Sequence, residues 1–265
     1  MSDEVFSEAD VARYWDANAD LWAREVRRGR DIAREGLNNP SFLAFIGDLR
    51  GKRVLDAGCG EGYNARILAR GGARVSGIDL SERMIALAMA EESREPLGIR
   101  YARASYADLS IFEDAGFDAV LSFMALMDGP HFDVAMREAF RVLRPGGMLA
   151  FSLTHPCFLT QGSEWIRNGK GDTTGWAVRG YFDSVPCIDS WRFVDAPTEI
   201  PKFELPRYDR TLSEYVNTLI EAGFRLTRLA EPRPSEEYCR AHPSQRVWRD
   251  HAALFLHVCA EKPAQ

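Results

Sequence analysis

Residues 54–62, VLDAGCGEG, decide the fold of this chain, because an apolar strand ending in an aspartate runs directly into a glycine-rich turn and then a helix-length segment. Glycine has no Cβ atom, so the turn can adopt positive φ angles and a ligand can lie against the backbone where the helix begins. Asp79 ends the next apolar stretch, 23 positions after Asp56. A carboxylate at that place can bind the vicinal hydroxyls of a ribose, so the pattern predicts a nucleoside-binding crevice.

Outward from this stretch, short apolar runs alternate with amphipathic segments of helical length, which is typical of βαβ units in a parallel sheet. The expected strands are residues 53–56, 74–79, 99–104, 117–123 and 148–154. Helix-end signals lie between them, namely Gly71 and Gly72, a capping Ser81, and the stop at 145–147 (PGG). The middle of the chain is therefore predicted to be a doubly wound, Rossmann-like α/β sheet.

Composition narrows the class of protein. The chain has 265 residues, 46% hydrophobic and 27% charged, which favours a folded domain over a disordered chain. Its longest apolar run, near residues 148–153, is far shorter than the roughly 20 residues of a membrane span, and Asp3 and Glu4 do not suit a secretion signal. A net charge of -6 disfavours a nucleic-acid partner. Five cysteines without C-x-x-C spacing predict reduced thiols, no metal site and a cytoplasmic protein.

The segments before and after this central part differ from it in composition and periodicity. Within a single domain over residues 1–265 we expect a helical N-terminal cap (1–50), a cofactor-binding core (51–154), a lid insertion after the fifth strand (155–209), and a C-terminal helix with strands at 224–229 and 252–260 (210–265). Aromatic residues gather in the cap and the lid, which suggests an enclosed apolar chamber for a planar or hydrophobic small molecule. The candidate substrate-binding residues are Tyr14, Trp15, Met127, Tyr181 and Tyr208.

Four motifs occur in an order that resembles the class I S-adenosylmethionine-dependent methyltransferases: 56–62 (DAGCGEG), 77–81 (GIDLS), 117–120 (FDAV) and 143–147 (LRPGG). The resemblance implies a seven-stranded sheet with an antiparallel last strand, S-adenosylmethionine as the cofactor, and S-adenosylhomocysteine as the product. It also implies a helical N-terminal cap like that of many small-molecule methyltransferases.

The same resemblance implies the cofactor-binding residues. Residues 56–62 would line the methionine part, and Asp79 would bind the ribose. Members of the family often carry an acidic residue near the adenine after the third strand, where this chain has Ser105 and Tyr106. A hydroxyl or backbone contact could replace that carboxylate. The candidates are Asp56, Gly58, Cys59, Gly60, Gly62, Asn64, Asp79, Leu80, Ser105, Tyr106 and Phe123, with Asn64 as either a ligand of the cofactor's carboxylate end or a plain helix-start residue.

Methyl transfer to an oxygen or nitrogen by in-line displacement needs alignment of the acceptor and, for a hydroxyl, a thiol or a charged amine, removal of a proton. His155 follows the fifth strand, where open α/β sheets place ligands, and is the first candidate base, with His131 after the fourth strand as the second. Each could instead have a purely structural role, and Asp128 in the same loop as His131 is ambiguous. If His155 is the base, His155→Ala should bind cofactor but lose turnover by roughly a hundredfold.

Several alternatives remain at this point. A nicotinamide dehydrogenase shares the strand, turn and acid, but its G-x-G-x-x-G spacing wants glycine where Tyr63 stands. The Cys157 thiol follows the fifth strand rather than the fourth, which argues against a cytosine-C5 DNA methyltransferase. A non-catalytic cofactor-binding protein, or a methyltransferase for protein or RNA, stays open. A solvated helix face explains the four arginines of the N-terminal segment better than a substrate contact does; they are Arg24, Arg27, Arg28 and Arg30. The sequence is compatible with a monomer or a homodimer.

Overall fold

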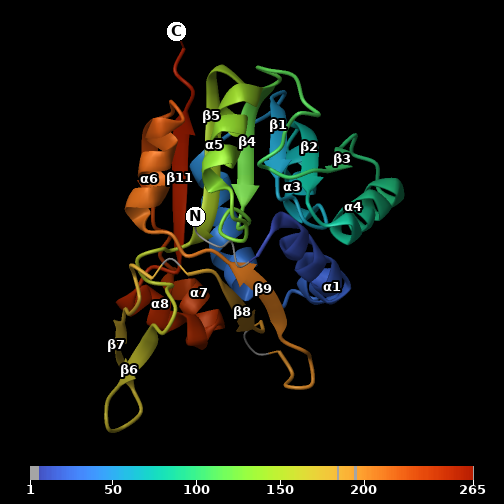
Figure 1. Cartoon of the computed structure of the whole chain (residues 1–265). Coiled ribbons are helices and arrows are strands. Elements are labelled where there is room, and N and C mark those ends of the chain that lie inside the picture. Colours follow the sequence, from blue (N-terminus) through green and yellow to red (C-terminus); the bar gives the residue numbers. More distant parts are fainter. Residues whose placement is uncertain (1–5, 184, 194–195, 265) are drawn as a thin grey trace.

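The computed structural model describes residues 6–183, 185–193 and 196–264, and its centre is a seven-stranded sheet of order β10-β11-β5-β4-β1-β2-β3 (Figure 1). All pairings are parallel except those of β11, which runs antiparallel to both of its neighbours. This confirms the predicted Rossmann-like fold with an antiparallel last strand. The strands are β1 (Arg53–Ala57), β2 (Arg74–Asp79), β3 (Arg100–Arg103), β4 (Phe117–Phe123), β5 (Leu143–Thr154), β10 (Arg225–Ala230) and β11 (Phe255–Glu261).

The sheet order reverses at β1, which pairs with β2 on one side and β4 on the other. From β1 the chain adds β2 and β3 outward, then returns across β1 to add β4 and β5. The connections therefore part at the carboxyl ends of β1 and β4 and leave a crevice there, as open α/β sheets do.

Helices cover both faces of the sheet. On one face, α2 (Asn39–Ile46) and α3 (Tyr63–Arg70) pack with inward residues such as Val54 and Leu121. On the other face, α5 (Phe132–Val142) and α6 (Leu212–Glu221) pack with Leu55 and Phe151. α4 (Glu82–Arg94) begins as predicted at Ser81, whose hydroxyl accepts a hydrogen bond from the Met84 amide at 3.0 Å.

The described parts of the segments predicted as the cap and the lid gather beyond the end of the sheet toward which β4 points (Figure 1). The N-terminal segment forms α1 (Glu8–Arg27) and a π-helix, η1 (Arg34–Asn38). Residues predicted as the lid form two antiparallel hairpins, β6 (Glu164–Arg167) with β7 (Thr173–Ala177) and β8 (Cys187–Trp191) with β9 (Phe203–Arg207). Their regular pairing was not evident in the sequence, because their few residues show little alternation.

Three details differ from the sequence-based expectations. β5 begins at Leu143 rather than 148. The segment 145–147, which was expected to end the preceding helix, therefore belongs to the strand, and α5 ends earlier, at Val142. The last strand begins at Phe255 rather than 252. Before it lie α7 (Glu236–Ala241), η2 (Pro243–Gln245) and α8 (Arg246–His251), which were not expected. α8 packs on the first hairpin through Trp248, whose ring lies 4.7 Å from that of Trp165 and 5.4 Å from that of Trp176.

None of the described helices is long and apolar enough to cross a lipid bilayer.

Candidate active site

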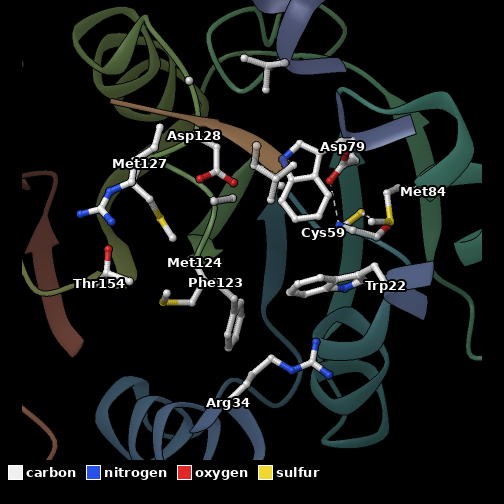
Figure 2. Close-up of a pocket in the computed structure, with 18 of the residues that line it drawn as sticks. Trp22, Arg34, Cys59, Asp79, Met84, Phe123, Met124, Met127, Asp128 and Thr154 are labelled. Atoms are coloured by element: carbon white, nitrogen blue, oxygen red, sulfur yellow. Dashed lines mark hydrogen bonds between the residues drawn. The ribbon is translucent and has the colours of Figure 1, made fainter. Parts of the chain in front are cut away.

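A cavity of about 500 Å³ opens at the carboxyl ends of the central strands. Its sheet side consists of the loops after β1, β2, β3, β4 and β5, and its outer side consists of residues from α1, η1, the β8–β9 hairpin and the η2–α8 segment. Figure 2 shows Asp79, Phe123 and Thr154 at this space, from the ends of β2, β4 and β5, and Asp128 from the loop after β4. Trp22 lies below Cys59 in this view, and Arg34 lies at the lower edge of the space. Its size falls in the range of pockets that hold a cofactor or a drug-sized molecule.

The glycine-rich turn is tied to the end of β2. The Gly60 amide donates to Asp79 Oδ2 at 2.8 Å, and the Ser81 amide donates to Asp79 Oδ1 at 2.9 Å. Gly58 has a φ of +80°, and a Cβ atom there would lie 2.4 Å from that of Ala125, so the turn passes too close to the β4 loop for any side chain. Asp79 therefore shapes the turn as well as facing the cavity, and any ligand hydroxyl it binds lies beside the Gly60 backbone.

A buried acidic group, Asp56, and a half-buried one, Asp79, lie at this turn. Burial, and then the charge of Asp79, raise the pKa of Asp56 to about 7. Burial raises the pKa of Asp79 to about 6 against the opposing hydrogen bonds from the Ser81 and Gly60 amides. Neither Asp56 oxygen makes a hydrogen bond of normal geometry within the described residues. The two carboxyl groups at the turn are therefore suited to bind ligand groups that donate hydrogen bonds or carry positive charge.

The raised pKa of Asp56 predicts a pH effect on stability. A carboxyl whose folded-state pKa lies above its unfolded value binds more protons when folded, so it lowers the free energy of unfolding as pH rises from about 4 to about 7. We expect Asp56→Asn to gain stability relative to the wild type by on the order of 3 kcal/mol over that interval. Chemical denaturation of both ligand-free proteins at pH 4.5 and 7.5 measures this, and parallel pH profiles would contradict it. Burial also lowers the pKa of His257 to about 4. The effect of His257 on stability is the same in both proteins, so it cancels in the comparison.

Arg34 supplies a buried positive charge to the lining of the cavity. It begins the π-helix η1 and lies over the Tyr63 ring, with its guanidinium carbon 4.4 Å from the ring centroid. Its Nε is 3.6 Å from Asp31 and its Nη2 is 3.8 Å from Glu35, and neither nitrogen makes a hydrogen bond among the residues that the structure describes. A buried guanidinium with unused donors that points into a cavity is suited to bind a carboxylate (Figure 2).

The π-helix is held from the sheet by a buried polar network. Asn38, at its last position, donates through Nδ2 to Ser152 Oγ on β5 at 3.2 Å, and its Oδ1 lies 3.0 Å from His257 Nε2 on β11. Single-turn π-helices are frequent at functional sites. The two strands thereby set the position from which Arg34 reaches the cavity.

Beyond β4, the cavity is wide and largely aromatic and apolar, with Trp15, Met127 and Trp191 among its lining. Asp128 enters it from the β4 loop, and the Trp15 side chain forms a hydrogen bond with its carboxyl group. Burial raises the pKa of Asp128 to about 8, against the opposing effects of that bond and of the Arg207 charge. Arg207 is itself paired with Asp209 at 2.7 Å and with Asp189 at 3.5 Å. No histidine from the described part of the chain lines the cavity.

The cavity brings together most of the residues that the sequence singled out. Those that line it are Asp56, Gly58, Cys59, Gly60, Asn64, Asp79, Leu80, Ser105, Tyr106 and Phe123 of the cofactor candidates, and Trp15 and Met127 of the substrate candidates. Asn64 presents its amide there with its Oδ1 held by Asn39 Nδ2 at 2.9 Å. The four arginines near the end of α1 are absent from the lining and have side chains between 37% and 59% exposed, which agrees with a solvated face.

His155 is placed differently from the expectation. It is 2% exposed and does not line the cavity, although Thr154 beside it does. Its Nε2 lies 2.8 Å from Glu231 Oε1, and its Nδ1 accepts a hydrogen bond from the Cys157 amide at 3.2 Å. Both ring nitrogens are thus engaged in holding the chain after β5, which favours a structural role for His155 over that of a base.

The other candidates lie outside the cavity. His131 is the residue before α5, and Gly62 precedes α3 with a φ of +85°, where a Cβ atom would lie 2.5 Å from the Tyr101 hydroxyl. Tyr14 packs edge-on against Phe6 at 6.3 Å. The hydroxyl of Tyr181 accepts the Leu212 amide at 2.9 Å, and that of Tyr208 donates to the Phe6 carbonyl. None of these five is among the cavity-lining residues.

Sequence reasoning missed several residues that line the cavity: Glu8, Arg34, Thr154, Arg207, Gln245 and Trp248. Glu8 and Arg34 lie in the N-terminal segment, and Gln245 and Trp248 lie in the helices that were not expected. Thr154 ends β5, next to the candidate His155. No local motif marks the other five, since each reaches the site through the packing of a segment outside the central strands. Asp128 was noticed, and only its burial distinguishes it from an ordinary loop residue.

Comparison with known proteins agrees with this geometry. Residues 55–151 match the methyltransferase domain family. The ubiquinone biosynthesis O-methyltransferase of Methylocella silvestris is 32% identical over 248 residues, covering 82% of this chain and 88% of that protein. In two other curated relatives, the part that matches this chain makes up only 58% and 56% of the relative's own length.

Solved structures agree as well. An S-adenosylmethionine-dependent methyltransferase from Mesorhizobium loti is similar with a TM-score of 0.69 and 29% identity, covering 84% of this chain and 96% of that one. The Burkholderia thailandensis 1,6-didemethyltoxoflavin-N1-methyltransferase, solved with S-adenosylhomocysteine, shares the fold at 16% identity and a TM-score of 0.58 over 99% of this chain and 93% of that one. The motifs, the sheet order and these relatives lead to one conclusion: the chain belongs to the class I S-adenosylmethionine-dependent methyltransferases and uses that cofactor.

Proposed function

We propose that this protein methylates a hydroxyl oxygen of a small, largely apolar or planar molecule. The observation that supports this most directly is the position of Asp128, whose carboxyl group faces the cavity beside aromatic and apolar residues, at the end of β4. A hydroxyl acceptor must lose a proton on transfer, and a carboxylate there can receive it. The O-methyltransferase relative from Methylocella silvestris supports oxygen as the acceptor atom.

The proposal divides the cavity into two parts. In the cofactor part, Arg34 and Asn64 would bind the methionine carboxylate, the backbone at Gly58 and Gly60 would lie along the methionine chain, and Asp79 would bind the ribose hydroxyls. In the acceptor part, Trp15, Met127 and Trp191 would enclose the acceptor. We propose that residues 1–50 act as a cap and 155–209 as a lid, since both supply walls of this part.

The cofactor supplies a methyl group on a positively charged sulfur. The protein would align the acceptor oxygen behind that group, and the bound acceptor between the aromatic walls would exclude water. Asp128 would take the hydroxyl proton when the methyl group passes from the cofactor to the acceptor oxygen. The Trp15 side chain orients the carboxyl group for this step.

The experiment is methyl transfer from labelled S-adenosylmethionine to a panel of phenols, aliphatic alcohols and amines. We expect organic-extractable label with phenols or alcohols and none with amines. Label on amines alone would contradict oxygen as the acceptor. Label retained on a gel after incubation with cell extract would instead indicate a protein or RNA substrate. Tight binding of S-adenosylhomocysteine without transfer to any acceptor would favour a non-catalytic binding protein.

A further inference from the structure

The order of strand ends fixes where the adenine ring must lie. β1, β2 and β3 are neighbours in the sheet, about 4.8 Å apart, and their carboxyl ends follow one another along its edge. The proposed cofactor site uses the loop after β1 for the methionine part and Asp79, at the end of β2, for the ribose. In that site the base would lie past the end of β3, where Ala104 and Ser105 line the cavity.

A carboxylate from a distant part of the chain occupies that place. Glu8, in the first turn of α1, lines the cavity and accepts a hydrogen bond from Ser105 Oγ through Oε1 at 2.6 Å. The Ala107 amide donates to the same Ser105 oxygen at 3.0 Å, so the hydroxyl proton is directed at Glu8. The other carboxylate oxygen of Glu8 makes no hydrogen bond with the residues described in the structure.

The start of α1 is held firmly enough to make Glu8 part of a built site. Ser7 and Asp10 form a capping box at its first turn, and the Tyr208 hydroxyl donates to the carbonyl of Phe6. Further along α1, Asp16 Oδ1 accepts hydrogen bonds from Ser81 Oγ at 2.6 Å and from the Arg83 amide at 3.0 Å. These two bonds fasten α1 to the start of α4.

The surroundings of Glu8 match a purine with an exocyclic amino group. Val11, Leu80, Met84 and Ala104 line this part of the cavity with apolar groups that suit the faces of a ring. We propose that Glu8 accepts a hydrogen bond from the adenine amino group of the cofactor, with Ser105 as the residue that positions its carboxylate. This inference rests on the proposed cofactor site, and it makes α1 a part of that site as well as a cap.

The test compares two ligands by calorimetry: S-adenosylhomocysteine, and S-inosylhomocysteine, in which a carbonyl oxygen replaces the amino group. In the wild type a carboxylate would face that oxygen, so we expect the adenosyl ligand to bind at least about tenfold more tightly. The Glu8→Gln side chain can donate to the carbonyl through its own amide. In that variant the adenosyl ligand should bind about tenfold more weakly than in the wild type, and the preference should fall to about one.

Glu221→Gln is the matched control, since it removes the same charge from an exposed residue at the end of α6, away from the cavity. It should keep the wild-type preference. Equal wild-type affinities for the two ligands would overturn the role of Glu8 whatever the variant does, and so would an unchanged preference in Glu8→Gln. Failure of the wild type to bind either ligand would overturn the proposed function instead.

Discussion

Replacing Asp128 with Asn should lower kcat by at least about a hundredfold with a hydroxyl acceptor, while the affinity for S-adenosylhomocysteine stays within about threefold. The asparagine keeps the shape and can still form a hydrogen bond with the Trp15 side chain, but it cannot receive a proton. Steady-state kinetics together with calorimetry on the same preparation separate these two effects. Equal losses of binding and of turnover would contradict a role as base.

The pH profile gives an independent check on Asp128. A base acts only when deprotonated, so kcat/KM of the wild type should fall about tenfold for each pH unit below the free-enzyme pKa of about 8. Above that pH it should level off. The residual activity of Asp128→Asn should lack this limb, and a limb that persists in the variant would assign the proton to another group.

His155→Ala provides the contrasting variant. Since His155 is outside the cavity and bonded to Glu231 and the Cys157 amide, its loss should reduce stability and leave kcat within severalfold of the wild type. A hundredfold loss of turnover with an unchanged melting temperature would restore His155 as the base that the sequence first indicated.

Replacing Arg34 with Met should weaken S-adenosylhomocysteine binding by roughly a hundredfold, because the ligand's carboxylate would lose its partner in a site with little water. The methionine side chain is of similar length and can still pack on Tyr63. 5′-Methylthioadenosine carries the same nucleoside and sulfur but no amino-acid end, so its affinity should be the same in the variant and the wild type. Calorimetry with both ligands measures the difference.

Arg24→Met is the control for the loss of one arginine near η1. The Arg24 side chain is 52% exposed and pairs with Glu25 at 3.0 Å, and it does not line the cavity. It should bind both ligands like the wild type. If Arg34→Met weakened the two ligands equally, Arg34 would act on the fold of the pocket rather than on the carboxylate.

Much of the fold could be predicted from local pattern. The strand and glycine turn at residues 54–62 and the acid at 79 have short-range physical causes: a buried parallel strand must be apolar, and the turn must pass close to the β4 loop. Six of the seven sheet strands were placed within three residues of their observed starts. β5 was the exception, because proline and glycine after α5 were interpreted as a break between elements rather than as the beginning of the strand.

The catalytic assignment depended on information that local pattern does not contain. His155 and Thr154 are neighbours in sequence, yet a strand directs successive side chains to opposite sides, and only Thr154 reaches the cavity. For Asp128, the sequence showed an acid in a loop, and tertiary packing beside Trp15 decided its burial and hence its raised pKa.

The sequence by itself determined the cofactor half of this protein, since the glycine turn and Asp79 belong to consecutive strands whose order follows from the βαβ pattern. Only the tertiary structure decided which other residues complete the cavity. Glu8 and Arg34 from the N-terminal segment, and Gln245 and Trp248 from the helices before β11, meet at the cavity because distant segments pack over one end of the sheet. Such contacts depend on long-range packing of apolar surfaces, which leaves no fixed spacing in the chain.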